Sequence, residues 1–145
     1  MSVIAWDGHN LVADRQLTTD GMIQSATKIW RLKDGSLVGA AGVFSNAVAF
    51  VKWLDAGADP EAYKDDWDTE EGGVTIIRIT KDREILIYVS QVPFTIEDDF
   101  AAIGSGAPYA IGALAAGLNS IKAVEIAMEY SADCGRGTNI LALDI

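Results

Sequence analysis

Short apolar runs separated by turn-forming residues fill the first third of the chain, and they predict β-strands. Strands of a half-buried sheet are rich in Val, Ile and aromatic residues, and an Asp-Gly pair between two such runs favours a tight hairpin turn. Two hairpins fit this pattern, residues 3–6 with 11–13 through Asp7-Gly8, and residues 28–33 with 36–42 through Asp34-Gly35. The pattern therefore predicts four strands in this third of the chain.

A different spacing begins near residue 46 and predicts a helix over residues 46–56. Its apolar side chains recur at the 3.6-residue period, Ser45 is suited to cap its start, and Gly57 is suited to end it. The next stretch, residues 59–71, is rich in Asp and Glu, which predicts a solvated loop around a short helical turn. It lacks the glycine and the oxygen-ligand spacing of a calcium-binding loop.

More strands are predicted in the second half of the chain. Residues 74–80 and 84–90 are rich in Ile and Val and are separated by three charged residues, so they predict a third hairpin. Residues 94–96 and 100–103 are apolar and predict two further short strands.

Two helices and a last strand complete the pattern. Pro108 fits the first turn of a helix that ends at Gly117, and Ser120 is suited to cap a second helix that runs to residue 130. Residues 139–143 predict the final strand. Helices gathered in blocks around antiparallel strands predict an α+β layered sandwich and disfavour an alternating parallel sheet.

Composition narrows the class of protein. The 145 residues are 50% hydrophobic and 22% charged, which is typical of one globular domain spanning residues 1–145. The net charge of −10 disfavours binding to nucleic acid or to an anionic membrane, since both carry negative charge themselves. We therefore expect neither as a partner.

Cysteine usage and hydropathy point to the cytoplasm. Cys134 is the only cysteine, so no internal disulfide can form, and the N-terminus lacks the basic-then-apolar pattern of a signal peptide. The uncharged run over residues 100–121 is long enough to span a bilayer, but its glycines and proline predict a strand, a turn and a buried helix instead. With His9 and Cys134 as the only soft ligands, we expect no metal and no cofactor.

The first two residues carry the candidate chemistry. Removal of Met1 would leave Ser2 with both a hydroxyl group and a free α-amine. The unperturbed pKa of such an amine is about 7.7 to 8.0, so it can act as a general base at neutral pH without a histidine. Met-Ser is a common start, so this pair alone is weak support for a catalytic terminus.

One run of residues, from Ala102 to Ala110, includes the sequences Ile-Gly-Ser-Gly and Pro-Tyr-Ala. Four other segments accompany it in a fixed order, namely Ala13-Asp14, Thr27-Lys28-Ile29, Ala41-Gly42 and Asp133 through Thr138-Asn139. Together these segments resemble proteasome β subunits, and most of all HslV, the bacterial proteasome-like peptidase; the first run is the most specific part. The resemblance covers nearly the whole chain. It implies a four-layer αββα fold and the mechanism of an N-terminal-nucleophile (Ntn) hydrolase.

The resemblance also implies roles for particular residues. Ser2 occupies the position of the nucleophile, Lys28 that of the lysine beside it, and Asp14 that of the carboxylate that pairs with the lysine. Gly42 would supply the N–H group of the oxyanion hole. Ser105 and Asp133 match positions that hydrogen-bond around the terminal amine. Taken singly, each of these residues has an ordinary structural interpretation, as an ion pair, a strand end, a helix cap or a turn.

The chain also departs from the family. The family commonly presents threonine where this chain has Ser2, and residues 59–71 are too short for the second helix of the first helical layer, which predicts a shortened layer. The resemblance implies a polypeptide substrate, a homo-oligomeric ring and an ATP-dependent unfoldase as partner. Two alternatives stay open, namely a catalytically silent relative with a structural or partner-binding role, and a hydrolase of small amides.

Overall fold

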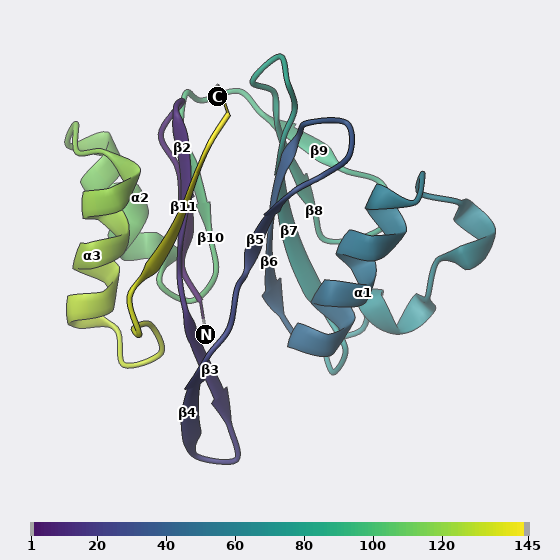
Figure 1. Cartoon of the computed structure of the whole chain (residues 1–145), viewed down its shortest axis with the longest axis horizontal. Coiled ribbons are helices and arrows are strands. Elements are labelled where there is room, and N and C mark those ends of the chain that lie inside the picture. Colours follow the sequence, from purple (N-terminus) through teal and green to yellow (C-terminus); the bar gives the residue numbers. More distant parts are fainter. Residues whose placement is uncertain (1, 144–145) are drawn as a thin grey trace.

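The computed structural model describes residues 2–143 and has four layers, with two β-sheets face to face and helices on both outer faces (Figure 1). The predicted αββα sandwich is confirmed. The strands are β1 (Ile4–Trp6), β2 (Asn10–Asp14), β3 (Gln16–Thr19), β4 (Met22–Ser25), β5 (Ile29–Arg31), β6 (Leu37–Gly42), β7 (Val74–Ile79), β8 (Ile85–Tyr88), β9 (Phe94–Ile96), β10 (Ala101–Ile103) and β11 (Thr138–Ala142). The α-helices are α1 (Phe44–Asp55), α2 (Ala107–Ala115) and α3 (Ser120–Tyr130), and two 3-10 helices are η1 (Pro60–Ala62) and η2 (Asp65–Asp68).

The two sheets are antiparallel and enclose the central core. One has the strand order β10-β1-β2-β11 and the other β5-β6-β7-β8-β9. Because side chains alternate along a strand, Ile4 and Trp6 point into the space between the sheets while Val3 and Ala5 face the helices. Ile77 and Ile79 of β7 meet them from the opposite sheet.

The two helical layers differ in size. Helices α2 and α3 pack against each other and cover the first sheet through small side chains such as Ala110 and Ala127. Within residues 2–143, α1 is the one α-helix on the second sheet, in agreement with the predicted shortened layer. The acidic stretch holds two 3-10 helices, η1 and η2, where one short helical turn was predicted. An aromatic cluster centred on Phe50 and Trp53 fills this layer. Among residues 2–143, no helix is long and apolar enough to cross a bilayer.

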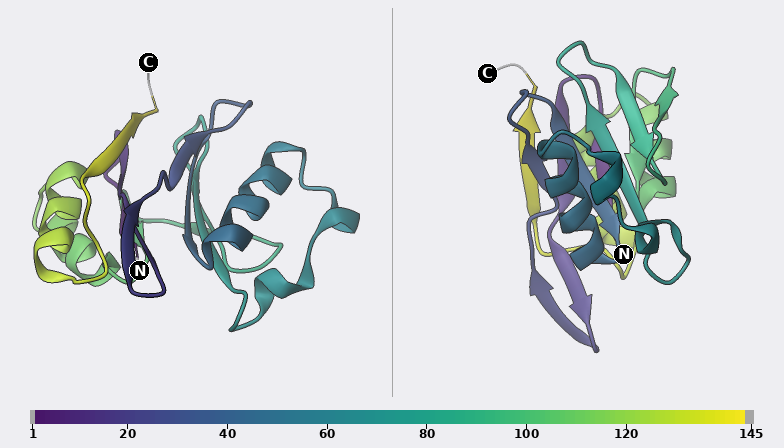
Figure 2. Two further views of the ribbon diagram at one scale, coloured as in Figure 1. Left: turned by 60° about the horizontal axis from the view of Figure 1, so that its bottom comes forward. Right: turned by 90° about the vertical axis from the view of Figure 1, so that its right-hand side faces the viewer.

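Residues 2–48, the described part of the first third, hold six strands instead of the predicted four. The additional pair, β3 and β4, forms a two-stranded hairpin that projects from the body of the molecule (Figure 2). Asp20 and Gly21 form its turn with positive φ angles, so this hairpin has the same Asp-Gly turn signal as the two predicted hairpins at Asp7-Gly8 and Asp34-Gly35. The strands were missed because most of their side chains are exposed and show no alternation of buried and polar positions.

Two predicted helix caps are wrong. Helix α1 begins one residue before Ser45, and no side chain caps it. Ser120 is the first residue of α3, and the cap is Asn119, whose side-chain oxygen accepts the N–H of Lys122 at 2.9 Å. Ser120 is buried instead, and its hydroxyl lies 3.0 Å from Oδ2 of Asp7.

Asp7 joins the β1–β2 turn to the start of α3. Its Oδ1 accepts the N–H groups of His9 and Asn10 at 2.9 and 2.8 Å, and its Oδ2 accepts the N–H of Ser120 at 2.9 Å. Partial burial raises the pKa of this carboxyl, but the hydrogen bonds outweigh it and the net pKa is lowered. A negative charge at the N-terminus of a helix adds to this stabilisation.

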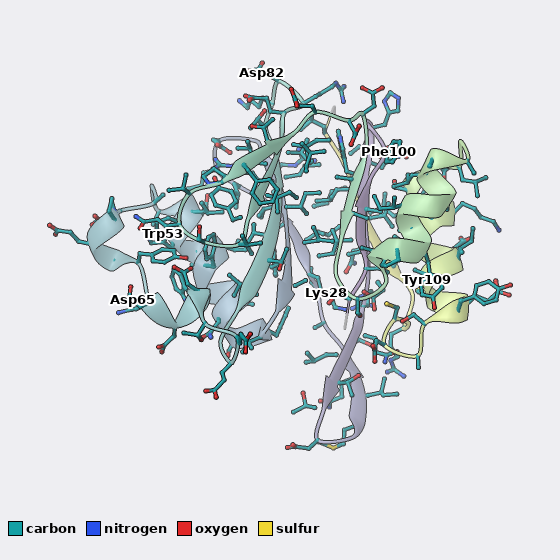
Figure 3. The ribbon with its side chains drawn as sticks, turned by 180° about the vertical axis from the view of Figure 1, so that it is seen from behind. Lys28, Trp53, Asp65, Asp82, Phe100 and Tyr109 are labelled. Atoms are coloured by element: carbon teal, nitrogen blue, oxygen red, sulfur yellow. The ribbon has the colours of Figure 1, made fainter. Side chains whose placement is uncertain are left out.

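We therefore expect Asp7→Asn to destabilise the fold near neutral pH by about 1 kcal/mol, reduced by the partial exposure of the group. Because the folded pKa is lowered, the carboxylate stabilises the fold above its unfolded pKa, and this contribution is lost as the pH falls through the folded pKa. Urea unfolding from pH 7 to pH 2.5 should show the two proteins converging in acid. Asp82→Asn, in the exposed β7–β8 turn (Figure 3), should show no such pattern, and a pH-independent difference for Asp7→Asn would contradict the prediction.

Candidate active site

Ser2 is held against the turn that follows β10. It is buried, and its N–H group donates to Oγ of Ser105 at 3.2 Å. Its carbonyl oxygen accepts the N–H of Gly106 at 2.9 Å. Gly104 has a φ of +95°, and a Cβ on it would collide with the same carbonyl. The glycines of the Gly-Ser-Gly run therefore let this turn close around Ser2.

Asp14 and Lys28 form a buried ion pair between the sheets. Lys28 Nζ lies 2.9 Å from Oδ1 of Asp14, and the two residues are 1% and 0% exposed. Asp14 ends β2 in the first sheet. Lys28 immediately precedes β5 in the second, where its carbonyl oxygen accepts the N–H of Ala40 at 3.0 Å. Figure 3 shows Lys28 in the space between the two sheets.

Four donors surround the Asp14 carboxylate. Oδ1 accepts from Lys28 Nζ and from the N–H of Val3 at 3.0 Å. Oδ2 accepts from the N–H groups of Gln16 at 3.2 Å and Gly135 at 3.1 Å. A buried carboxylate is stable only when it is paired and hydrogen-bonded, and these donors meet that need. They also bring Lys28 and Val3, the residue after Ser2, to one oxygen atom.

Gly42 lies at the end of β6, two residues after Ala40. Its φ is +102°, and a Cβ there would collide with the carbonyl oxygen of Gly73. The backbone at this point therefore requires glycine. Strand pairing fixes the position of Gly42 in the second sheet. The N–H of Ala40 donates to the carbonyl of Lys28, and Gly42 lies opposite Val74 of β7.

Asp133 stands apart from the other candidates. It is exposed in the loop between α3 and β11, and its own N–H lies 3.4 Å from Oγ of Ser131. Within residues 2–143, its carboxylate makes no hydrogen bond to Ser2 or Asp14. The same loop does reach the site, but through the backbone N–H of Gly135.

Cys134 lies next to the site without being placed to react. Its sulfur packs beneath Gly106 and Val3, and the residue is 4% exposed. Burial raises the pKa of its thiol, which keeps it neutral at pH 7. Cys134 therefore acts as a small apolar side chain under the turn that holds Ser2.

Two contributors to the site, Gln16 and Gly135, were not predicted from the sequence, because both reach Asp14 through backbone N–H groups. Such donors leave no side-chain signal in a sequence.

Residues 2–143 hold no group of three or more His, Cys, Asp or Glu side chains arranged to bind a metal ion.

Solved structures with the same architecture are proteasome-like. HslV from Trypanosoma brucei aligns over 97% of each chain with a TM-score of 0.73 and 22% identity. BPH from Thiobacillus denitrificans in complex with epoxomicin aligns over 100% of each chain with a TM-score of 0.70 and 21% identity. A second structure of BPH aligns over 97% of this chain and 96% of that one, with a TM-score of 0.67 and 20% identity. No protein-family model and no curated protein matches the chain. At this level of identity the comparisons establish the proteasome-like fold.

Proposed function

We propose that this chain is an N-terminal-nucleophile amide hydrolase that cleaves peptide bonds with Ser2, once Met1 has been removed. One observation carries the proposal. Oδ1 of Asp14 accepts hydrogen bonds from both Lys28 and Val3, which brings a buried cation next to the residue that would bear the free amine. The proteasome-like fold supports the same assignment.

In the proposed reaction the α-amine of Ser2 takes the proton of its own hydroxyl as the oxygen adds to the substrate carbonyl carbon. The resulting oxyanion would accept a hydrogen bond from the N–H of Gly42. The protonated amine then gives its proton to the leaving nitrogen as the C–N bond breaks. This leaves an ester on Ser2, which water hydrolyses with the amine again acting as the base.

Lys28 and Asp14 have complementary parts in this proposal. The ammonium group of Lys28 disfavours protonation of the nearby amine, so more of the amine is free to act as a base. Asp14 fixes the ammonium group and offsets the cost of burying it. Ser105 would hold the amine in place, since its hydroxyl already accepts from the nitrogen of Ser2. Asp133 contributes only if its exposed carboxylate turns toward the amine.

Assembly belongs to the same proposal. A homo-oligomeric ring would cover apolar side chains that a single chain leaves exposed, such as Val92 at 74% and Phe94 at 49%. A polypeptide delivered by an ATP-dependent unfoldase would be the substrate of such a ring. A hydrolase of small amides remains the second candidate, because the outer layer on the second sheet is reduced to one α-helix.

Intact mass spectrometry tests the proposal at its first requirement. Methionine aminopeptidase accepts small side chains after the initiator methionine, so the protein purified from a bacterial cytoplasm should lack Met1. Ser2→Leu, with a bulky second residue, should retain it and serves as the control. A wild-type protein that keeps Met1 on most molecules would contradict the catalytic proposal and favour the silent relative. Residues fused ahead of Met1 should abolish hydrolysis without unfolding the protein.

A further inference from the structure

The loop between α3 and β11 reaches the candidate site at one backbone group. Within residues 131–135 the chain turns back on itself, with the N–H of Cys134 donating to the carbonyl of Ser131 at 3.3 Å. The N–H of Gly135 then donates to Oδ2 of Asp14 at 3.1 Å. Asp133 is exposed in this loop, while its neighbour Cys134 is buried under the turn that holds Ser2.

The side chain of Gln16 bridges the same loop. Gln16 is 7% exposed at the start of β3, and its Nε2 donates to the carbonyl of Ala132 at 3.1 Å and to Oγ1 of Thr18 at 3.3 Å. A Cβ placed on Gly135 would lie 2.7 Å from its Oε1. The amide of Gln16 therefore contacts both ends of the 132–135 segment, and a side chain at position 135 would have to displace it.

We propose that Gln16 is a positioning residue, whose side-chain amide holds residues 132–135 so that the N–H of Gly135 stays on Asp14. Its backbone N–H bonds to the same oxygen, so Gln16 supplies one donor to Asp14 directly and secures the second through the loop. With both donors in place, Oδ2 is saturated and Oδ1 faces Lys28 and Val3. A buried carboxylate that loses a donor is destabilised, because the lost hydrogen bond is not replaced by water.

The inference rests on the proposed function only for its effect on catalysis. Whether the side chain of Gln16 holds the N–H group of Gly135 on Asp14 can be measured in a protein without activity. Another bond also holds Gly135, since its carbonyl oxygen accepts the N–H of Arg15 at 3.0 Å. If that bond alone fixes the loop, the side chain of Gln16 is dispensable. The experiment must distinguish this case from a loop that also needs the Gln16 amide.

The test replaces Gln16 with methionine, which keeps the length and packing of the side chain but removes its donor to Ala132. Hydrogen exchange resolved to single residues should show the amide of Gly135 exchanging about tenfold faster, while amides of β1 and β2 keep their rates. Peptide hydrolysis should show kcat reduced by about tenfold with KM unchanged, because Gln16 would act through Asp14 and not on the substrate.

Two controls keep the result interpretable. Ser131→Ala removes a hydroxyl that interacts with Asp133 and Cys134 of the same loop but leaves the side chain of Gln16 intact, and it should leave the exchange of Gly135 unchanged. Thr18→Val removes the other acceptor of the Gln16 amide and should also have no effect. An unchanged Gly135 rate in Gln16→Met, or an equal acceleration throughout β1, β2 and β11, would overturn the inference. If the wild type cleaves no peptide, the proposed function fails, and the exchange of Gly135 still decides the role of Gln16.

Discussion

Ser2→Ala is expected to lose peptide hydrolysis by at least about a thousandfold, the largest effect that any single change in this chain should have. Alanine keeps the free amine and is accepted by methionine aminopeptidase, so the general base is still present. The oxygen that forms the acyl-enzyme ester is missing. Turnover of a fluorogenic peptide amide measures the loss, and an unchanged melting temperature shows that the fold is intact.

Covalent capture tests the same residue independently of turnover. An α′,β′-epoxyketone such as epoxomicin reacts when a hydroxyl oxygen adds to its ketone and the amine of the same residue opens its epoxide, with the amine proton passing to the epoxide oxygen. All atoms are retained, so the protein gains the whole mass of the inhibitor. Wild type and Ser2→Thr should gain it at residue 2, since both offer the hydroxyl and the amine. An adduct in Ser2→Ala, or on any other residue, would show that the nucleophile lies elsewhere.

Lys28→Met is expected to lose a hundredfold or more of the same activity. Methionine keeps most of the apolar stem but removes the cation, so the amine of Ser2 would be more protonated at pH 7 and a poorer base. The change also leaves Asp14 as a buried charge without its cation, which costs about 3 to 5 kcal/mol of stability. Activity and thermal unfolding must therefore be measured on the same samples.

Two variants separate chemistry from stability. Combining Lys28→Met with Asp14→Asn removes both charges, so folding should largely recover while hydrolysis stays low. Lys122→Met removes the cation of an exposed pair with Glu125, 3.6 Å apart, and should change neither stability nor activity noticeably. Full activity in a folded Lys28→Met protein would mean that the lysine is structural and that the amine needs no neighbouring cation.

Much of the fold could be predicted because its strands are apolar and its turns are specific. The Asp7-Gly8 and Asp34-Gly35 pairs mark hairpins whose strands are buried on at least one face, so pattern and turn agree. The hairpin at Asp20-Gly21 has the same turn signal without the burial pattern, since its strands project into solvent. The two misplaced caps, Ser45 and Ser120, show that a serine near a helix start can be used elsewhere, in one case to bind Asp7.

The candidate site was harder to predict than the fold. Asp14 and Lys28 are fourteen residues apart in the sequence and belong to different sheets, so no local pattern predicts that they pair. Their pairing was predicted only from the resemblance to proteasome β subunits. Their supporting donors are backbone groups, whose positions depend on the tertiary structure. Asp133 matched a family position in sequence, yet its side chain is exposed and Gly135 makes the contact with Asp14.

Asp14 ends a strand of one sheet and Lys28 immediately precedes a strand of the other, so their pairing depends on when the two sheets dock during folding. Each sheet could form its own hairpins while the other is still disordered, but the buried pair exists only after the two sheets have docked. In the proposed mechanism, a nascent or partly unfolded chain would carry Ser2 without the neighbouring charge that activates its amine. If the proposed function holds, catalytic competence would then appear only after the two sheets have docked.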